Sequence, residues 1–517
     1  MPAPDLTLGD MIRDNAERFP DVPAYVADGA ALTHAGLLAR ATAVASALAG
    51  AGLRRQDRIA VLGRNSAEFG EVLTAGWLSG IVVATVNFRL APPEIARILA
   101  DSAPRVLFCD AKYVPLVDKL RPSLPGIETV VTFGEATQPD VVAYADLLAS
   151  GDAGTIPFHA RTDDIACLIY TSGTTGRPKG AMLGQWEMRR LAYTMNVEMR
   201  SGPTDRVLLV MPQFHIGAMA IGLGLHARGG TAVLHRQFEP AAALEAIVAD
   251  GITVLHLAPV MLQALLDAAT TAPDALAGIR TVVYSAAPIT PPTLHAALAA
   301  MPGAGFLNLY GQTEVITSGL PRELHTTGDS DADRRRLSSV GHPFPDSVVR
   351  IVDDDGNDVP RGEAGEIVVA SGATFRGYWN DSAATAATLR DGWCHTGDIG
   401  RVDDEGLLHL VDRKKDVVIS GGENVYCPEV EDAVVAHPEV AACAVIGVPD
   451  ERWGEAVCAV VVPVPGAHVT LEMLRAHTRT LIASYKAPRR VEIVDALPLL
   501  VTGKIDKKEL RARYTVS

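Results

Sequence analysis

The chain has 517 residues, of which 48% are hydrophobic and 21% are charged. This length predicts roughly three structural units, and the composition excludes bulk disorder. The 46 Lys and Arg residues against 61 Asp and Glu residues give a net charge of −15, which argues against a nucleic-acid binder because a phosphate backbone requires a basic surface.

The cysteines and the first residues predict the compartment of the protein. Six cysteines without a Cys-x-x-Cys pair provide neither a disulfide framework nor a zinc site, which suits a reducing compartment. Residues 1–20 contain Asp5, Asp10 and Asp14 and lack the continuous apolar run of a signal peptide. We also find no uncharged stretch of about 18 apolar residues. We therefore expect a cytoplasmic protein without stable membrane insertion.

The first part of the chain alternates strand-like and helix-like segments. Residues 59–62 form an apolar run, and Asn65-Ser66 offers a helix N-cap. Residues 67–78 then have helical periodicity, and residues 81–86 are β-branched. Similar strand-like runs follow at 106–109, 129–132, 207–211, 231–234, 253–257 and 281–284. This alternation predicts an α/β protein with largely parallel sheets.

The texture of the sequence changes from about residue 348. The turn sequences 353–357 and 403–406 lie between short strand-like runs, which predicts hairpins. We therefore expect a large N-terminal domain over residues 1–412, built of α/β subdomains, with a β-rich subdomain at about 340–412.

The last part of the chain reads as a compact α+β module. Residues 440–448 and 456–462 are strand-like, and residues 471–482 are helix-like. We place the main boundary in the charged stretch 412–416, although such a charge run is equally explained as a solvated turn. The prediction is a small, mobile C-terminal domain over residues 413–517.

The strongest chemical signal is the segment YTSGTTGRPKG at residues 170–180. It follows an apolar run, so a loop leaves a strand. Its glycines let backbone N–H groups turn toward a polyanion, its hydroxyls add donors and Lys179 adds charge. The spacing of a Walker A loop is absent. A flexible polar loop is the plain alternative, but the density of glycine, hydroxyl and lysine argues against it.

The segment resembles the phosphate loop of the adenylate-forming superfamily of acyl-CoA synthetases, peptide-synthetase adenylation domains and beetle luciferases. Further blocks in the same order strengthen the resemblance: MPQFH at 211–215, NLYGQTE at 308–314, HTGD at 395–398, DRKKD at 412–416, SGGEN at 420–424 and TGKI at 502–505. The resemblance implies a two-step reaction, in which a carboxylate and ATP give an acyl-adenylate and pyrophosphate before a thiol takes the acyl group.

The resemblance also implies the residues that bind ATP. Lys504 would bridge the carboxylate and the phosphate as the catalytic lysine, although a surface lysine in a basic tail is the alternative and the preceding PLLV at 498–501 departs from the family. Glu314, with Thr313, would hold Mg²⁺ on the phosphates. The expected nucleotide contacts are Thr171, Ser172, Gly173, Thr174, Thr175, Gly176 and Lys179 for phosphate, Ala286, Asn308, Tyr310, Gly311 and Gln312 around adenine, and Asp398 with Arg413 at the ribose.

The acyl pocket is expected around His215. Amino-acid-activating relatives usually carry an aspartate at this position, so a histidine argues against an amino-acid substrate. No Arg or Lys lies between residues 211 and 227, which argues against a second carboxylate on the substrate. We predict an uncharged, apolar acid of the medium-chain fatty, cycloalkyl or aryl class. Its walls would include Gly217, Met219, Gly311 and Val315, with Ala218, Ile221, Gly222, Gly224 and Ile316 nearby.

The rest of the chain is similar to 4-chlorobenzoate:CoA ligase and medium-chain acyl-CoA synthetases, which implies CoA as the acceptor. Ser420, Gly421 and Gly422 would line the pantetheine passage. The matching nucleotide contacts are Arg89, Trp453, Tyr485 and Arg489, while Ala487 replaces a basic residue of that relative. Trp453 is equally explained as a core residue.

Lys415 occupies the family's hinge position, about which the C-terminal module would rotate between the two steps. We therefore predict an AMP-forming carboxylate:CoA ligase that takes ATP, CoA and a small carboxylic acid, with Mg²⁺ on the ATP. An enzyme that loads a carrier-protein phosphopantetheine is the main alternative. Nothing specific in the sequence indicates a luciferase-like oxygenase, and the presence of Lys504, Glu314 and the phosphate loop argues against a catalytically silent binding protein. The expectation of a homodimer rests on the resemblance alone.

Overall fold

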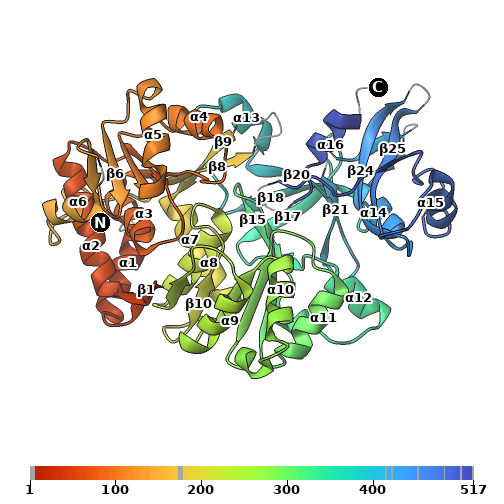
Figure 1. The fold of residues 1–517 in the computed structure, drawn as a ribbon, viewed down its shortest axis with the longest axis horizontal. Helices are drawn as coiled ribbons and strands as arrows, with labels where there is room; N and C mark the ends of the chain where they lie inside the picture. The colour runs from red at the N-terminus through yellow and green to blue at the C-terminus, as the bar shows by residue number, and fades with distance from the viewer. Residues whose placement is uncertain are drawn as a thin grey trace. The chain divides into compact units, whose positions relative to one another are not determined.

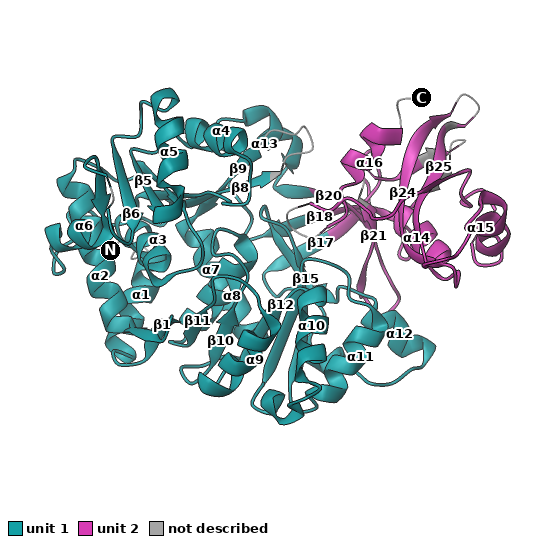
Figure 2. Ribbon diagram, viewed as in Figure 1, with its two compact units in different colours: residues 1–349, 369–395 teal, residues 350–368, 396–517 magenta. Residues whose placement is uncertain are grey.

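The structure, a computed structural model, describes residues 6–136, 138–172, 178–413, 416–420, 423–450, 453–482, 484–500 and 504–514. The chain divides into two compact units (Figure 2). Unit 1 comprises residues 1–349 with 369–395, and unit 2 comprises residues 350–368 with 396–517. The boundary that we predicted at residues 412–416 stays a prediction.

A seven-stranded sheet forms the first part of unit 1, in the order β7-β6-β5-β3-β4-β8-β9 (Figure 1). All neighbouring pairs are parallel except β8 and β9. Its strands are β3 (Arg58–Leu62), β4 (Val82–Thr85), β5 (Val106–Asp110), β6 (Thr129–Phe133), β7 (Val141–Ala143), β8 (Ile165–Ser172) and β9 (Pro178–Gly184). The associated helices are α1 (Leu8–Arg18), α2 (His34–Gly50), α3 (Ala67–Ser79), α4 (Pro92–Ser102), α5 (Val114–Leu120) and α6 (Tyr144–Ser150).

A nine-stranded sheet forms the second part of unit 1, in the order β16-β15-β14-β13-β12-β10-β11-β1-β2. Its strands are β1 (Pro23–Ala27), β2 (Ala30–Thr33), β10 (Arg206–Leu209), β11 (Thr231–Leu234), β12 (Val254–Leu257), β13 (Thr281–Ser285), β14 (Gly305–Gly311), β15 (Ile316–Gly319) and β16 (His342–Pro343). Pairing is parallel from β1 to β14 and antiparallel at both ends. The helices are α7 (Gln185–Met199), α8 (Ile216–His226), α9 (Pro240–Ala249), α10 (Pro259–Ala269), α11 (Pro291–Ala300) and α12 (Asp331–Leu337).

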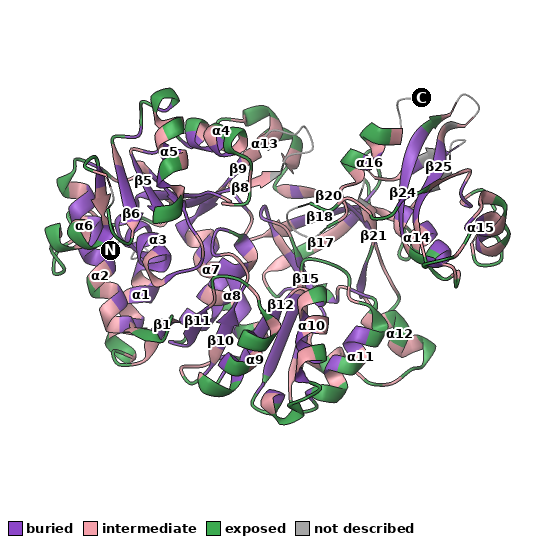
Figure 3. Ribbon diagram, in the orientation of Figure 1, coloured by how far each residue is buried: buried purple, intermediate pink, exposed green. Residues whose placement is uncertain are grey.

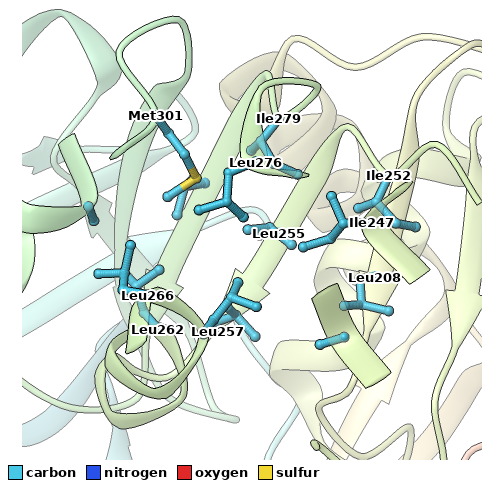
Figure 4. Packing of buried hydrophobic residues seen from close by; sticks show 14 of the residues in the cluster. Leu208, Ile247, Ile252, Leu255, Leu257, Leu262, Leu266, Leu276, Ile279 and Met301 are labelled. Atoms are coloured by element: carbon cyan, nitrogen blue, oxygen red, sulfur yellow. The ribbon is translucent and has the colours of Figure 1, made fainter. Parts of the chain in front are cut away.

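The core of this second part lies between the parallel strands and helices α9 to α11 (Figure 4). Leu208, Leu255 and Val282 are fully buried in successive neighbouring strands. Leu262 and Leu265 of α10 pack into the same cluster. Strands β11 and β12 are buried along their whole length, as Figure 3 shows for β12, because helices cover the sheet and exclude water.

Helix α3 shows how local sequence sets an element. Ser66 is its N-cap, since its side chain accepts a hydrogen bond from the Phe69 N–H. Gly80 ends it in the left-handed region, with φ of 78°. The helix that we predicted at residues 67–78 is therefore confirmed, with its cap.

A further sheet, in the order β17-β18-β20-β19 with β21 beside β20, contains strands that run across the division between the units. Its strands are β17 (Ser347–Val352), β18 (Gly365–Ser371), β19 (Leu389–Arg390), β20 (Trp393–Val402) and β21 (Leu408–Arg413), with α13 (Ser382–Thr388) in unit 1. The turn at 403–406 joins β20 and β21 as a hairpin, as predicted. The turn at 353–357 also closes a short hairpin, as predicted, because Val352 pairs antiparallel with Asp358 and the Val359 N–H donates to the Ile351 carbonyl over 3.0 Å.

The C-terminal module of unit 2 is a sheet in the order β23-β22-β25-β24, with β26 beside β25. Alternate residues of β25 fill two cores: Val457 and Val461 face the cluster with α14 and α15, while Cys458 and Val460 face the cluster with α16. The elements are β22 (Val418–Ser420), β23 (Glu423–Val425), α14 (Cys427–Val435), β24 (Val440–Asp450), β25 (Gly454–Pro463), α15 (Leu471–Thr478), β26 (Arg490–Ile493) and α16 (Lys507–Tyr514). The helix predicted at residues 471–482 ends earlier, at Thr478.

These findings confirm the predicted α/β fold, with a large N-terminal part and a small α+β C-terminal module. All six cysteines are free and buried. Burial raises the pKa of the Cys109, Cys167, Cys427 and Cys458 thiols to about 12. Among the described residues, no helix is long and apolar enough to cross a membrane.

Candidate active site

The parallel strands of the nine-stranded sheet bring the predicted adenine residues to one edge. Strands β13 and β14 are in register, with Ser285 opposite Leu309. Ala286 therefore follows β13 beside the end of β14, where Tyr310 lies. The carboxyl-terminal edge of such a sheet is where open α/β folds bind ligands. The register thus groups three of the predicted contacts, Ala286, Asn308 and Tyr310.

Ala286 has an unusual backbone conformation at this edge. Its φ is 75°, in the region that non-glycine residues avoid. Such a conformation costs on the order of 1–3 kcal/mol and persists where the surrounding structure enforces it, which is frequent at functional sites. This strain marks the end of β13 as a functional candidate, independently of the sequence motif.

Thr313 and Glu314 lie at the tip of the hairpin between β14 and β15. The Gln312 N–H donates to the Val315 carbonyl over 2.9 Å, and the Val315 N–H donates back over 3.2 Å. A glutamate after a threonine is also typical of a helix start, but these reciprocal bonds make the pair the tip of a hairpin. A side chain at Gly311 would place its Cβ 2.9 Å from Ile316 Cα, so this close approach requires glycine.

Glu314 is connected to Lys179 through a residue that the sequence did not single out. The carboxylate is 6% exposed and accepts a hydrogen bond from Tyr378 Oη over 2.6 Å. The Lys179 ammonium lies 5.0 Å from the centre of the same tyrosine ring. Burial and the nearby Glu314 charge raise the pKa of Tyr378, so it stays a hydrogen-bond donor. Tyr378 thus joins the predicted metal and phosphate residues.

Backbone hydrogen bonds hold Tyr378 beside β9. The Met182 N–H donates to the Gly377 carbonyl over 2.9 Å, and the Trp379 N–H donates to the Gly180 carbonyl over 2.7 Å. The sequence gives little reason to predict a role for Tyr378, because an aromatic residue after a glycine is common. Its contact with Glu314 joins residues 64 positions apart.

The predicted phosphate loop joins β8 and β9. Thr171 pairs with Lys179 and Ser172 with Pro178 across the antiparallel strands. Gly173, Thr174, Thr175 and Gly176, together with the Ser172 side chain, lie outside the described residues. The strands therefore place the two ends of the loop next to each other, with Lys179 at its exit.

His215 is the N-cap of α8. Its Nδ1 accepts a hydrogen bond from the Gly217 N–H over 3.2 Å, and the residue is exposed. The preceding segment 211–214 is held by Asn65, whose Oδ1 accepts from the Gln213 N–H over 2.8 Å. Asn65 Nδ2 also donates to the Met211 carbonyl over 3.0 Å. Asn65, which precedes the N-cap of α3, therefore holds the segment that ends at His215.

The predicted acyl-pocket residues differ in exposure. Gly217 is half-buried at the start of α8, whereas Met219 and Val315 are only 5% and 1% exposed. Gly224 contacts α7, since a Cβ there would lie 2.6 Å from Met199 Cε, so it serves helix packing. The structure adds His256 on β12, 3.5 Å from the position of a Cβ at Gly217.

In unit 2, Asp398 and Arg413 lie opposite each other on β20 and β21. Asp398 is 7% exposed, and its N–H donates to Thr396 Oγ1 over 3.1 Å. The Arg413 side chain lies outside the described residues. The backbone therefore pairs the two residues expected at the ribose.

Lys504 lies in a turn that begins the last helix of unit 2. Its carbonyl accepts a hydrogen bond from the Leu500 N–H over 2.7 Å, and Leu499 pairs with Ile505. The residue is exposed. Residues 501–503 lie outside the described residues.

The predicted CoA residues of unit 2 include a stacked pair. The Arg489 guanidinium lies 4.0 Å from the centre of the half-buried Trp453 ring. Tyr485 is 37% exposed. Ser420 is 3% exposed and pairs with Gly454 next to Trp453, while Gly421 and Gly422 lie outside the described residues.

Arg89 of unit 1 belongs to a cationic cluster. Arg64, Arg89 and Lys112 each lie 5.5–5.7 Å from the centre of the Phe88 ring. Burial lowers the pKa of Arg89 and of Lys112, and the positive charge of Arg64 lowers both further. Mutually repelling cations that share one ring form a candidate anion site, although the net charge of the chain is negative.

The donor set fits magnesium bound through a nucleotide. Among the residues that the structure describes, no group of three or more His, Cys, Asp or Glu side chains could enclose a metal ion. Mg²⁺ commonly uses one or two carboxylates together with substrate phosphates and water. Glu314, a single buried carboxylate that shares Tyr378 as a neighbour with Lys179, fits that pattern.

Comparisons with known proteins cover almost the whole chain. Residues 12–379 match the AMP-binding enzyme family, and residues 429–504 match the AMP-binding enzyme C-terminal domain. A feruloyl-CoA synthase of Amycolatopsis sp is 37% identical over 508 residues, covering 98% of this chain and 99% of that protein. The fatty acid–acyl-carrier-protein ligase ScoC of Streptomyces coeruleorubidus is 35% identical, covering 98% and 96%. The crystal structure of ATP-bound MatB from Rhodopseudomonas palustris aligns with a TM-score of 0.88 and 29% identity, covering 99% of each chain.

Proposed function

The chain belongs to the AMP-binding enzyme family, in its acyl-CoA ligase branch, and from this premise we propose that it is an AMP-forming carboxylate:CoA ligase for an uncharged acid with a largely apolar tail. A carboxylate oxygen forms a bond to the α-phosphorus of ATP while the bond to pyrophosphate breaks. The thiol sulfur of CoA then attacks the acyl carbon, AMP leaves and the thiol proton is released.

The observation that carries the proposal is that Tyr378 contacts both Lys179, through its ring, and Glu314, through its hydroxyl. The first step places four negative charges near a weak nucleophile, so it needs positioning and charge neutralisation. Lys179 neutralises phosphate charge, and Glu314 would hold the Mg²⁺ that neutralises the remainder. The exposed Lys504 would bridge the carboxylate and the α-phosphate.

Two features support CoA as the acceptor. The Arg489 guanidinium stacked on Trp453 suits an adenine and its phosphates. The cluster of Arg64, Arg89 and Lys112 suits a further phosphate, and the Arg64 Nε is buried without a hydrogen-bond partner among the described residues. A carrier protein has no adenine to bind. Loading of a carrier protein remains the second candidate, because the 35% identical relative ScoC has that activity by name.

Release of AMP tests the proposal directly. Alkyl, aryl and dicarboxylic acids are screened with ATP and Mg²⁺, with and without CoA. We expect AMP and an acyl-CoA from an uncharged aryl or medium-chain acid, with saturation by CoA at micromolar to millimolar concentration. Activity with a phosphopantetheinylated carrier protein and none with CoA would favour the second candidate. ATP binding without AMP release from any acid would refute both.

The variant Lys504→Ala tests the lysine. We expect pyrophosphate release to fall by roughly 10²- to 10³-fold or more, because a positioned charge is lost at the reacting phosphate. Thioester formation from supplied acyl-adenylate should persist. Lys508→Ala removes an exposed charge from the adjacent α16 and is the matched control. Unchanged pyrophosphate release in Lys504→Ala would contradict the assignment.

A further inference from the structure

His256 is a buried histidine at the sheet edge that carries the candidate site. It is the third residue of β12 and is 1% exposed. Its backbone pairs with Val283 of β13, two residues before Ser285. The side chain therefore lies under the carboxyl-terminal edge, between α8 and the end of β13.

The two ring nitrogens of His256 have different environments. Nε2 lies 3.0 Å from Ser285 Oγ, a hydrogen-bond distance. Nδ1 is buried and has no hydrogen-bond partner in the described part of the chain. Leaving such a buried group unpaired is unfavourable, because it has lost its hydrogen bond to water and gained none in the protein. A native protein retains such a group when a ligand or another partner satisfies it.

The ring edge faces the start of α8. A Cβ at Gly217 would lie 3.5 Å from His256 Cε1 and 3.6 Å from His215 Nδ1. Glycine therefore leaves the edge of the imidazole uncovered by a side chain next to the candidate acyl-pocket histidine. Burial, with a smaller effect from His215, lowers the pKa of His256 to about 4, so the ring is neutral near pH 7.

We propose that His256 is a specificity-determining residue of the acyl site, whose unpartnered Nδ1 hydrogen-bonds a hydroxyl or keto oxygen on the otherwise apolar tail of the acid. This inference rests on the proposed function. A hydroxyl fits either tautomer, since it can both donate and accept. A second carboxylate fits poorly, because a neutral ring supplies no charge to offset its burial. The preferred substrate is thus an oxygenated acid without a second charge.

Matched acids test the proposal in the complete protein. AMP release with CoA is measured for benzoate and 4-hydroxybenzoate, cinnamate and 4-hydroxycinnamate, and octanoate with its 3-hydroxy and 3-oxo derivatives. We expect the oxygenated member of at least one set to have a kcat/KM about 10-fold or more above its parent. In His256→Leu this ratio should fall toward one. No preference in any set of the wild-type protein would overturn the proposal.

A second variant and a control separate specificity from stability. His256→Gln retains a side-chain hydrogen-bonding group and should keep part of the preference for the oxygenated acid. This variant also tests the proposal if His256→Leu does not fold. His226→Leu is the control. His226 is equally buried, but it ends α8, about 15 Å along the helix axis from the first residue of that helix. Its Nε2 lies 3.0 Å from the Ala24 carbonyl oxygen. Its loss should leave the ratio unchanged.

The outcomes distinguish this inference from the proposed function. If the wild-type protein releases no AMP with any acid, both fail. If it releases AMP and the folded His256 variants keep the wild-type ratio, or lose activity equally for every acid, only the inference fails. An equal loss would mean that His256 stabilises the fold or positions the carboxylate of the acid and makes no hydrogen bond to an oxygen on its tail.

Discussion

At the scale of single residues, Tyr378 joins two motifs that the sequence identified separately. Sequence motifs predicted Lys179 and Glu314, because their residue types and order match a family. They did not predict Tyr378 or His256, since each gains its candidate role from contacts with residues distant in the chain. The Tyr378 hydroxyl and the His256 ring become informative only when burial and hydrogen bonding are known.

Replacement of Tyr378 by phenylalanine isolates the hydrogen bond to Glu314. The variant keeps the ring beside Lys179 and removes the donor 2.6 Å from the carboxylate. A hydrogen bond to a charged group contributes about 1.5–3 kcal/mol, so we expect kcat/KM for Mg·ATP to fall ~10- to ~100-fold. Steady-state kinetics at varied Mg·ATP measure this.

Tyr144→Phe provides the matched control. Tyr144 is also buried and its hydroxyl donates to a buried glutamate, Glu71, which Arg40 also contacts. We expect this variant to lower stability without changing the dependence on Mg·ATP. An unchanged dependence in Tyr378→Phe as well would show that the tyrosine does not position Glu314.

At the scale of elements, the parallel strands could be predicted from the sequence, because each is an apolar or β-branched run. Turns were harder to predict. The sequence left Glu314 open to interpretation as a helix start, whereas reciprocal backbone hydrogen bonds between Gln312 and Val315 make it a hairpin tip. Helix α15 stops at Thr478, four residues before the predicted end, because periodicity does not determine where the last turn unwinds.

The segment that carries His215 depends on Asn65. Asn65→Ala removes the acceptor for the Gln213 N–H and the donor to the Met211 and His235 carbonyls. We expect the free energy of unfolding to fall by about 2 kcal/mol or more, because buried backbone groups lose their partners. Denaturant unfolding measures this, and kinetics should show a raised KM for the acid. Wild-type stability and KM in this variant would contradict the role of Asn65.

At the scale of the whole molecule, the predicted nucleotide and acceptor residues are divided between two compact units. Lys179, Glu314 and Arg89 belong to unit 1, whereas Lys504 and Trp453 belong to unit 2. The sequence indicated two parts through its change of texture, but the compact units cut through β17, β18 and β20, which no local pattern reveals.

Lys415→Pro tests whether the two reaction steps need different arrangements of the units. Proline fixes φ, and the proposed hinge needs that torsion to change. We expect pyrophosphate exchange to remain measurable while acyl transfer to CoA falls ~10²-fold or more. A small misplacement of the reacting groups is enough to lower a rate by about this factor. Lys415→Ala keeps the torsional freedom and should retain both half-reactions. Equal losses of both half-reactions in Lys415→Pro would reject the hinge.

The burial of all six native thiols has a practical consequence for observing such a motion. Buried thiols react slowly with maleimide dyes, because the reagent has little access to the sulfur. Cysteines introduced at two exposed positions, such as Val248 on α9 and Ile493 on β26, would therefore carry a fluorophore pair without prior removal of the native cysteines. The ratio of donor to acceptor emission would then report the distance between the two dyes during turnover.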